Sequence, residues 1–136
     1  MNEYQFAGVF DRIKAYAVDM GLIFISMIIF AQIFSSMGQV DSIYKIMVFV
    51  LLFFLYEPVM VGLVGSTLGH KAMGLKVVKE NDDKPIGLFK AVIRFIVKVL
   101  LGWISLLTIS GNSKKQAIHD LSVGSYVVLV KKPINS

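Results

Sequence analysis

The chain has 136 residues, of which 56% are hydrophobic and 17% are charged, and its formal net charge is +5. Soluble domains have about 45–50% apolar and about 25% charged residues. This composition excludes a disordered chain and a water-soluble domain, and it predicts a small integral membrane protein with a single domain. The chain contains no cysteine, which excludes disulfide bonds, cysteine-ligated zinc and thiol catalysis.

The first apolar block follows a short polar N-terminal stretch, and we expect it to form a helix over about residues 12–36. It is long enough to span, because about 20 helical residues cross a hydrocarbon core of about 30 Å. From Ala15 onward, Asp19 is the only charge before Asp41. The length, the internal aspartate and the missing small-residue cleavage site favour a transmembrane helix over a signal peptide.

The second apolar block predicts a helix over about residues 43–64. Glu57 and Pro58 interrupt it, and the proline removes a helical hydrogen bond and should kink the helix. The connector between the two blocks is short and contains Gly38. The two helices are therefore predicted to form a hairpin across the bilayer.

Two polar stretches, the loop at residues 65–88 and the tail at residues 110–136, differ in composition from the apolar blocks. Each contains a short β-branched run that is typical of a strand, at residues 75–79 and 125–130. We expect these runs to pair as a small two-stranded sheet, which requires both to lie on one side of the membrane.

The third segment, about residues 89–109, is less uniformly apolar. Lys90, Arg94 and Lys98 are spaced by four residues and would form one basic stripe on a helix. Its charge-free part, residues 99–109, would be only about 16 Å long as a helix, roughly half of the hydrocarbon core. We expect an amphipathic interfacial helix followed by a re-entrant segment. A tilted third span with snorkelling basic side chains is the alternative.

Basic residues predict the orientation, because they are enriched on the cytoplasmic side of membrane proteins. A two-span topology leaves Lys45 as the only basic residue outside. A three-span topology would place four basic residues of the tail outside: Lys114, Lys115, Lys131 and Lys132. We therefore expect an all-α membrane protein with two spans and a re-entrant segment, in a bacterial inner membrane, with both termini in the cytoplasm.

Asp19 and Glu57 are carboxylates within apolar blocks, where a charge costs roughly 2.5–3.5 kcal/mol to insert. In the hairpin they would lie at similar depth near the cytoplasmic side and could face each other. Two desolvated carboxylates have raised proton affinity and also suit a hard cation such as sodium. They are therefore candidates for proton and cation exchange. The alternative is a purely structural role, with Arg12, Arg94 or Lys14 neutralising them.

Other functions find little support. The glycine-containing turn at residues 65–71 lacks the spacing of a phosphate loop, and two histidines are too few for a histidine metal site. We expect no catalytic residue, metal site or cofactor, and no nucleic-acid binding, because topology explains the basic residues. The alternative to exchange is a scaffold that binds a partner or anionic lipid through the basic stripe. An exchanger with so few spans would need to form homo-oligomers or join another membrane protein.

Several of these unusual residues occur together in a known family, the RDD family of small membrane proteins, which the chain resembles over nearly its whole length. Arg12 matches the family arginine at the start of the first helix, and Asp19 matches the first family aspartate. Residues 65–71 are similar to the family's Gly-x-Thr-x-Gly-Lys-Lys/Arg turn, with His70 where lysine is usual. Residues 91–94 match its Ala-x-x-Arg, and Asp120, in the closing motif at residues 116–128, matches the second aspartate.

The resemblance implies an integral membrane protein whose function is mostly unassigned. Transport of unidentified ligands has been suggested for the family, and some relatives are described as sodium/proton antiporters. Asp120 therefore joins Asp19 and Glu57 as a candidate ion- or proton-binding residue. The family residues could instead determine the fold, with Asp120 capping a helix or pairing with Arg12 or Arg94.

Overall fold

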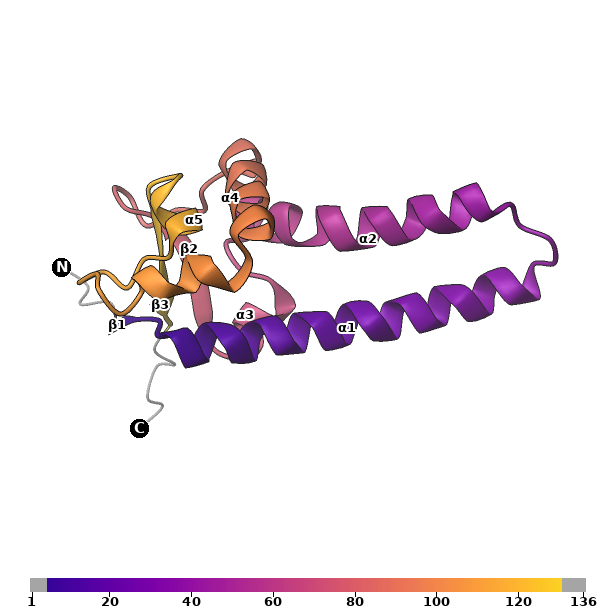
Figure 1. The fold of residues 1–136 in the computed structure, drawn as a ribbon, viewed down its shortest axis with the longest axis horizontal. Coiled ribbons are helices and arrows are strands. Elements are labelled where there is room, and N and C mark those ends of the chain that lie inside the picture. Colours follow the sequence, from indigo (N-terminus) through magenta and orange to yellow (C-terminus); the bar gives the residue numbers. More distant parts are fainter. Residues whose placement is uncertain (1–4, 131–136) are drawn as a thin grey trace.

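The computed structural model describes residues 5–130 and consists of a long helical hairpin joined at one end to a smaller unit, here called the head (Figure 1). The head comprises residues 5–8 and 64–130. Residues 1–4 and the lysines at 131 and 132, which entered the topology prediction, lie outside the described residues. In chain order the elements are β1 (Gln5–Phe6), α1 (Val9–Ser36), α2 (Ser42–Leu63), α3 (Leu68–Ala72), β2 (Leu75–Lys79), α4 (Leu88–Leu101), the 3₁₀-helix η1 (Gly102–Thr108), α5 (Ile118–Leu121) and β3 (Ser125–Leu129).

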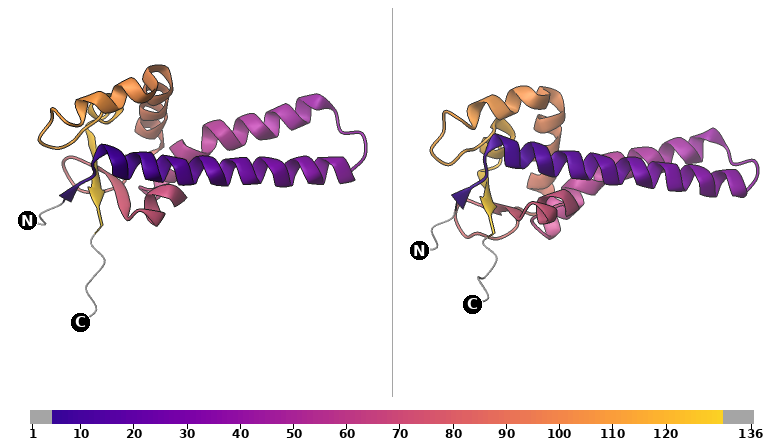
Figure 2. Two further views of the ribbon diagram at one scale, coloured as in Figure 1. Left: turned by 60° about the horizontal axis from the view of Figure 1, so that its bottom comes forward. Right: turned by 90° about the horizontal axis from the view of Figure 1, so that it is seen from below.

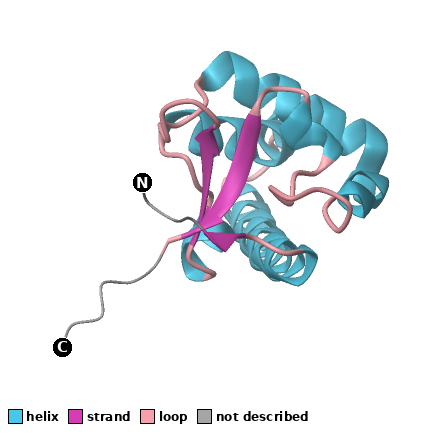
Figure 3. Ribbon diagram, turned by 90° about the vertical axis from the view of Figure 1, so that its left-hand side faces the viewer, coloured by secondary structure: helices cyan, strands magenta, loops and turns pink. Residues whose placement is uncertain are grey.

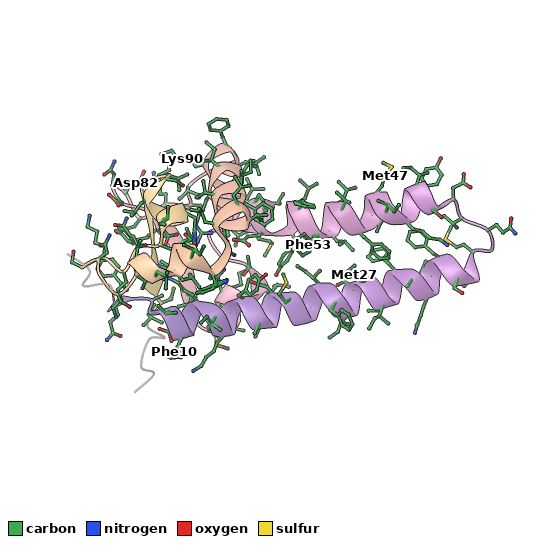
Figure 4. All side chains as sticks on the ribbon, viewed as in Figure 1. Phe10, Met27, Met47, Phe53, Asp82 and Lys90 are labelled. Atoms are coloured by element: carbon green, nitrogen blue, oxygen red, sulfur yellow. The ribbon has the colours of Figure 1, made fainter. Side chains whose placement is uncertain are left out.

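The hairpin confirms the two predicted spanning helices, α1 and α2. They are joined by a turn at Gly38, whose φ of 86° lies in the region that favours glycine. Only 11% of the apolar window of α1 and 17% of that of α2 are buried within the protein. Most apolar side chains of both helices are therefore on the protein surface, which is favourable where lipid rather than water surrounds them. Figure 4 shows Met27 and Met47 along the hairpin, whereas Asp82 and Lys90 lie in the head.

The small sheet lies in the head and has the strand order β1-β3-β2, with both pairs antiparallel (Figure 3). The predicted pairing of residues 75–79 with the tail is confirmed, in a register that sets Val77 opposite Val127. The third strand, β1, was not predicted. It pairs Gln5 with Leu129 and Phe6 with Val128, and two residues are too short for an alternating pattern.

The sheet places three distant parts of the chain at one end of the hairpin. β1 precedes α1, β2 follows α2, and both pair with β3 near the end of the chain. Both views in Figure 2 show the hairpin projecting away from this end. The hairpin therefore leaves the head and returns to it.

The third apolar segment, Leu88–Thr108, is long and apolar enough to be a candidate span by length and composition. It is not straight, however, because α4 ends at Gly102, whose φ is 55°, and η1 continues from there. The chain on either side of the segment also returns to the same place: the Gln116 side chain donates to Glu80, just after β2, and to the Ser125 carbonyl. This geometry supports a re-entrant segment rather than a tilted third span.

Small residues set the position of α4 against α2. A Cβ atom added at Gly62 would lie 2.8 Å from the Leu88 Cα, so only glycine allows the start of α4 to approach so closely. The core of the head contains residues of the sheet and of all three long helices. That core consists of Ala7, Ala15, Val61, Leu75, Val77, Ile86, Ala91, Val123 and Val127.

Candidate functional site: a polar junction between hairpin and head

Four charged residues meet where the hairpin joins the head. α1 contributes Arg12, α2 contributes Glu57, α4 contributes Arg94 and α5 contributes Asp120. Their side chains are at most 12% exposed and form a continuous series of ion pairs. We call this series the ion-pair cluster.

Asp120 is the centre of the ion-pair cluster and is completely buried. Its Oδ2 accepts from Arg12 Nη1 at 2.5 Å, and its Oδ1 accepts from Arg94 Nε at 3.0 Å. It also accepts from the Ala117 N–H at 3.1 Å, which caps α5, so both structural roles considered for it occur. Burial alone would raise the pKa of the Asp120 carboxyl, but the attraction of Arg94 and Arg12 outweighs it and lowers that pKa.

Glu57 has two cationic partners. Lys98 Nζ lies 2.7 Å from Oε2 and 2.8 Å from Oε1, and Arg94 Nη1 lies 3.3 Å from Oε1. Arg94 therefore connects Glu57 to Asp120, and the pairs hold α4 and α5 against the end of α2. Glu57 and Asp19 line the same cavity but have no hydrogen-bond partner in common.

Asp19 is 7% exposed and has partners of another kind. Its Oδ1 accepts from the Tyr56 hydroxyl and the Gly69 N–H, each at 2.8 Å, and its Oδ2 accepts from Thr67 Oγ1 at 2.5 Å. Within residues 5–130, no lysine, arginine or histidine nitrogen lies within 4.0 Å of this carboxylate. The expectation that Arg12 or Arg94 neutralises it is wrong, since both arginines bind Asp120.

The turn before and within α3 brings the neutral donors to Asp19. A Cβ atom at Gly69 would lie 2.1 Å from the Ala15 carbonyl oxygen and 2.7 Å from the Asp19 Cγ, so glycine is required for α3 to contact α1. Thr67 is the N-cap of α3: its Oγ1 accepts from the His70 N–H at 3.1 Å while its hydroxyl donates to Asp19.

The two histidines lie beside the charged groups and are buried. Desolvation, followed by repulsion from Arg94, lowers the pKa of His70 to about 4 and that of His119 to about 3. Both are therefore neutral at pH 7. His119 Nδ1 lies 2.7 Å from Ser105 Oγ, a contact the sequence does not reveal because fourteen residues separate the two.

The predicted basic stripe does not form one exposed surface. Lys90 is exposed, but Arg94 is only 2% exposed and Lys98 is bound to Glu57. The spacing of four correctly places the residues on one side of α4. Beyond Lys90, this side of α4 faces α2 and α5. There Glu57 and Asp120 pair with Arg94, and Glu57 also pairs with Lys98.

A cavity of about 490 Å³ lies beside both carboxylates, between α1, α2, α4 and η1. Figure 4 shows Phe53, one of its lining residues, on α2 close to the head. Its buried base is polar and its more exposed rim is apolar. The base contains Arg12, Asp19, Glu57, His70, Arg94 and His119.

Comparison with known proteins identifies the family of this chain. The sequence model of the RDD family matches residues 6–124, nearly the whole chain. The chain belongs to the RDD family. This RDD protein is similar to the uncharacterized protein YckC of Bacillus subtilis (strain 168), with 29% identity over 135 residues that cover 93% of this chain and 87% of YckC. No solved structure matches it.

In this RDD protein, the family motifs meet at the junction although they are far apart in sequence. Arg12 and Asp120, 108 residues apart, form an ion pair, and Arg94 joins them. Asp19 instead receives Thr67 and Gly69 of the glycine turn. The resemblance directed attention to that turn, but nothing in the sequence pointed to Tyr56, an aromatic residue within the second apolar block.

Proposed function

We propose that this RDD-family membrane protein exchanges a monovalent cation such as sodium for protons, and that Asp19 is the group that binds them. One observation carries the proposal: Asp19 is a buried carboxylate beside a cavity, and within residues 5–130 it has only neutral donors as partners. A buried carboxylate without a cationic partner is costly as an anion. Binding a proton or a cation removes that cost.

The geometry around Asp19 leaves room for such a ligand. A carboxylate has about four lone-pair positions, and three accept hydrogen bonds here, two on Oδ1 and one on Oδ2. The remaining position on Oδ2 can take a proton. The Tyr56 and Thr67 hydroxyl oxygens lie within hydrogen-bond distance of the same carboxylate and supply further oxygen ligands for a hard cation.

The other two carboxylates of the junction, Glu57 and Asp120, are not proposed to bind the proton or the cation. Glu57 and Asp120 each bind two cationic side chains, so protonating either would leave a buried cation unpaired. Asp19 has no such constraint, and its charge can change without breaking an ion pair. The proposal assigns no catalytic residue, and it requires homo-oligomers, because one hairpin cannot enclose a path across a bilayer.

The test is cation-dependent proton movement in everted membrane vesicles containing the full chain, followed by fluorescence quenching of a pH-sensitive dye. Sodium addition should dissipate the proton gradient with the wild-type protein, and Asp19→Asn should abolish that response. Asp41→Asn is the matched control, because Asp41 is an exposed aspartate at the far end of the hairpin. Full exchange by Asp19→Asn at equal membrane abundance would refute the proposal.

A further inference from the structure

The cavity at the junction combines a buried polar base with an exposed apolar rim. Arg12 and Arg94 in the base are at most 7% exposed, whereas five rim side chains are 40–75% exposed. The five are Ile13, Tyr16, Phe53, Val99 and Trp103. We propose that this cavity binds an anionic phospholipid, with its phosphate at Arg12 and one acyl chain against the rim.

An unpartnered donor belongs to a residue that lines the cavity. Arg12 Nη1 donates to Asp120, and Nη2 donates to the Lys115 carbonyl at 2.7 Å. Arg12 Nε is buried and has no hydrogen-bond partner among residues 5–130. Buried donors are almost always satisfied, so this N–H calls for an acceptor, and a phosphate oxygen is a strong one.

The charges lining the cavity agree with an anionic ligand. Arg12, Arg94 and Lys98 contribute three positive charges, against two negative charges from Asp19 and Glu57. Lys98 Nζ has three donors, of which the Glu57 oxygens accept two, so one remains. Asp120 does not line the cavity but pairs with both arginines, so these six charges balance. The donors left for a phosphate are the third N–H of Lys98 and the N–H of Arg12 Nε.

The apolar rim favours a lipid over a free anion. The rim residues belong to the three segments that are apolar enough to cross a membrane, so their exposed faces meet acyl chains. Lys98 Nζ lies 5.1 Å from the centre of the Tyr16 ring, so the basic end of the cavity and its aromatic rim adjoin. A phospholipid matches this order of charge and apolar surface, whereas inorganic phosphate would leave the rim uncovered.

This inference goes beyond the exchange proposal and is tested without measuring transport. The chain has a single tryptophan, Trp103, and it lies on the rim. The full chain is reconstituted in vesicles with phosphatidylglycerol or phosphatidylcholine carrying brominated acyl chains, which quench nearby tryptophan. We expect brominated phosphatidylglycerol to associate about fivefold more strongly, as one favourable charge contact at a membrane predicts. Equal association of the two lipids would overturn the inference.

Matched variants on α4 separate the cavity from the general surface. Val99→Phe narrows the cavity and should reduce the preference for phosphatidylglycerol at least twofold. Val92→Phe adds the same atoms at an exposed valine of the same helix that does not line the cavity, and it should leave the preference unchanged. Identical behaviour of the two variants would place the anionic lipid elsewhere.

Two further measurements define the headgroup contact. Arg12→Lys keeps a positive charge near Asp120 but removes the Nε–H, and it should weaken phosphatidylglycerol association while leaving phosphatidylcholine unaffected. Inorganic phosphate at millimolar concentration should not displace the brominated lipid. Displacement would show that the cavity binds the free anion and would overturn the lipid assignment. Should Arg12→Lys fail to fold, the two valine variants still decide the question.

Discussion

Asp19 and Asp120 are both buried aspartates at the junction of hairpin and head, but their partners differ in kind. Asp120 binds two arginines and caps a helix, whereas Asp19 accepts hydrogen bonds from two hydroxyls and one backbone amide. A carboxylate between two cations must remain charged to keep them buried. One held by neutral donors has no such requirement. The comparison therefore separates a carboxylate bound by two arginines from one that, within residues 5–130, is held by neutral donors.

The largest expected effect is the loss of stability in Asp120→Asn. The substitution removes the charge that compensates Arg12 and Arg94, and breaking a buried ion pair from one side costs about 3–5 kcal/mol. Unfolding by sodium dodecyl sulfate in mixed micelles, followed by circular dichroism, measures the change. Asp19→Asn should cost about 1 kcal/mol or less, because the amide can reform hydrogen bonds with Tyr56 and Thr67. Equal losses in the two variants would abolish the distinction.

A smaller effect is expected when α3 is pushed away from α1. Gly69→Ala places a methyl group against the Ala15 carbonyl, which should cost about 1–3 kcal/mol and weaken the contacts with Asp19. Gly21→Ala is the control, because Gly21 lies in α1 with no atom within 4 Å of an added Cβ. That control should be neutral or slightly stabilising, since alanine favours helix more than glycine. The same micelle assay compares the two, and a stable Gly69→Ala protein would contradict the packing described.

A further effect is a dependence of stability on pH between 7 and 5. The pKa of His70 is lowered to about 4 and that of His119 to about 3, so the unfolded chain takes up protons first as the pH falls below their ordinary value of 6.5. The free energy of unfolding should therefore decrease from pH 7 to pH 5, on the order of 1 kcal/mol per pH unit. Because the pKa of Asp120 is lowered, it stays ionised in this range and adds no slope.

Two glutamine substitutions check the origin of that slope. His70→Gln and His119→Gln each remove one titrating group, so each should flatten the dependence of unfolding free energy on pH. A slope unchanged in the double variant would assign the effect to other residues.

The sequence predicts the hairpin well because hydrophobicity alone determines it. The expected helices at residues 12–36 and 43–64 begin and end within three residues of α1 and α2, and the first ends at the same residue as α1. The pairing of β2 with β3 also follows from two β-branched runs on one side of the membrane. β1 could not be predicted, since two residues carry no pattern and are held only by a strand formed more than a hundred residues later.

The site is less predictable, because its decisive contacts join residues far apart in the chain. The cost of a buried charge correctly drew attention to Asp19 and Glu57, but matched depth does not decide which partner each one meets. The partners of Asp19 depend on Gly69, because only glycine lets the α3 backbone approach α1 closely enough to donate to this carboxylate. Periodicity likewise placed Arg94 and Lys98 on one helix face without showing that the face turns inward toward carboxylates.

The central position of β3 has a consequence for how the protein is made. Chains fold from the N-terminus during synthesis, so both hairpin helices can enter the bilayer before β3 and α5 exist. Arg12 and Arg94 must wait for Asp120, and β1 and β2 must wait for β3. The residues that connect the ends of these helices are therefore synthesised after both helices, and until Asp120 is made the two arginines lack their shared partner.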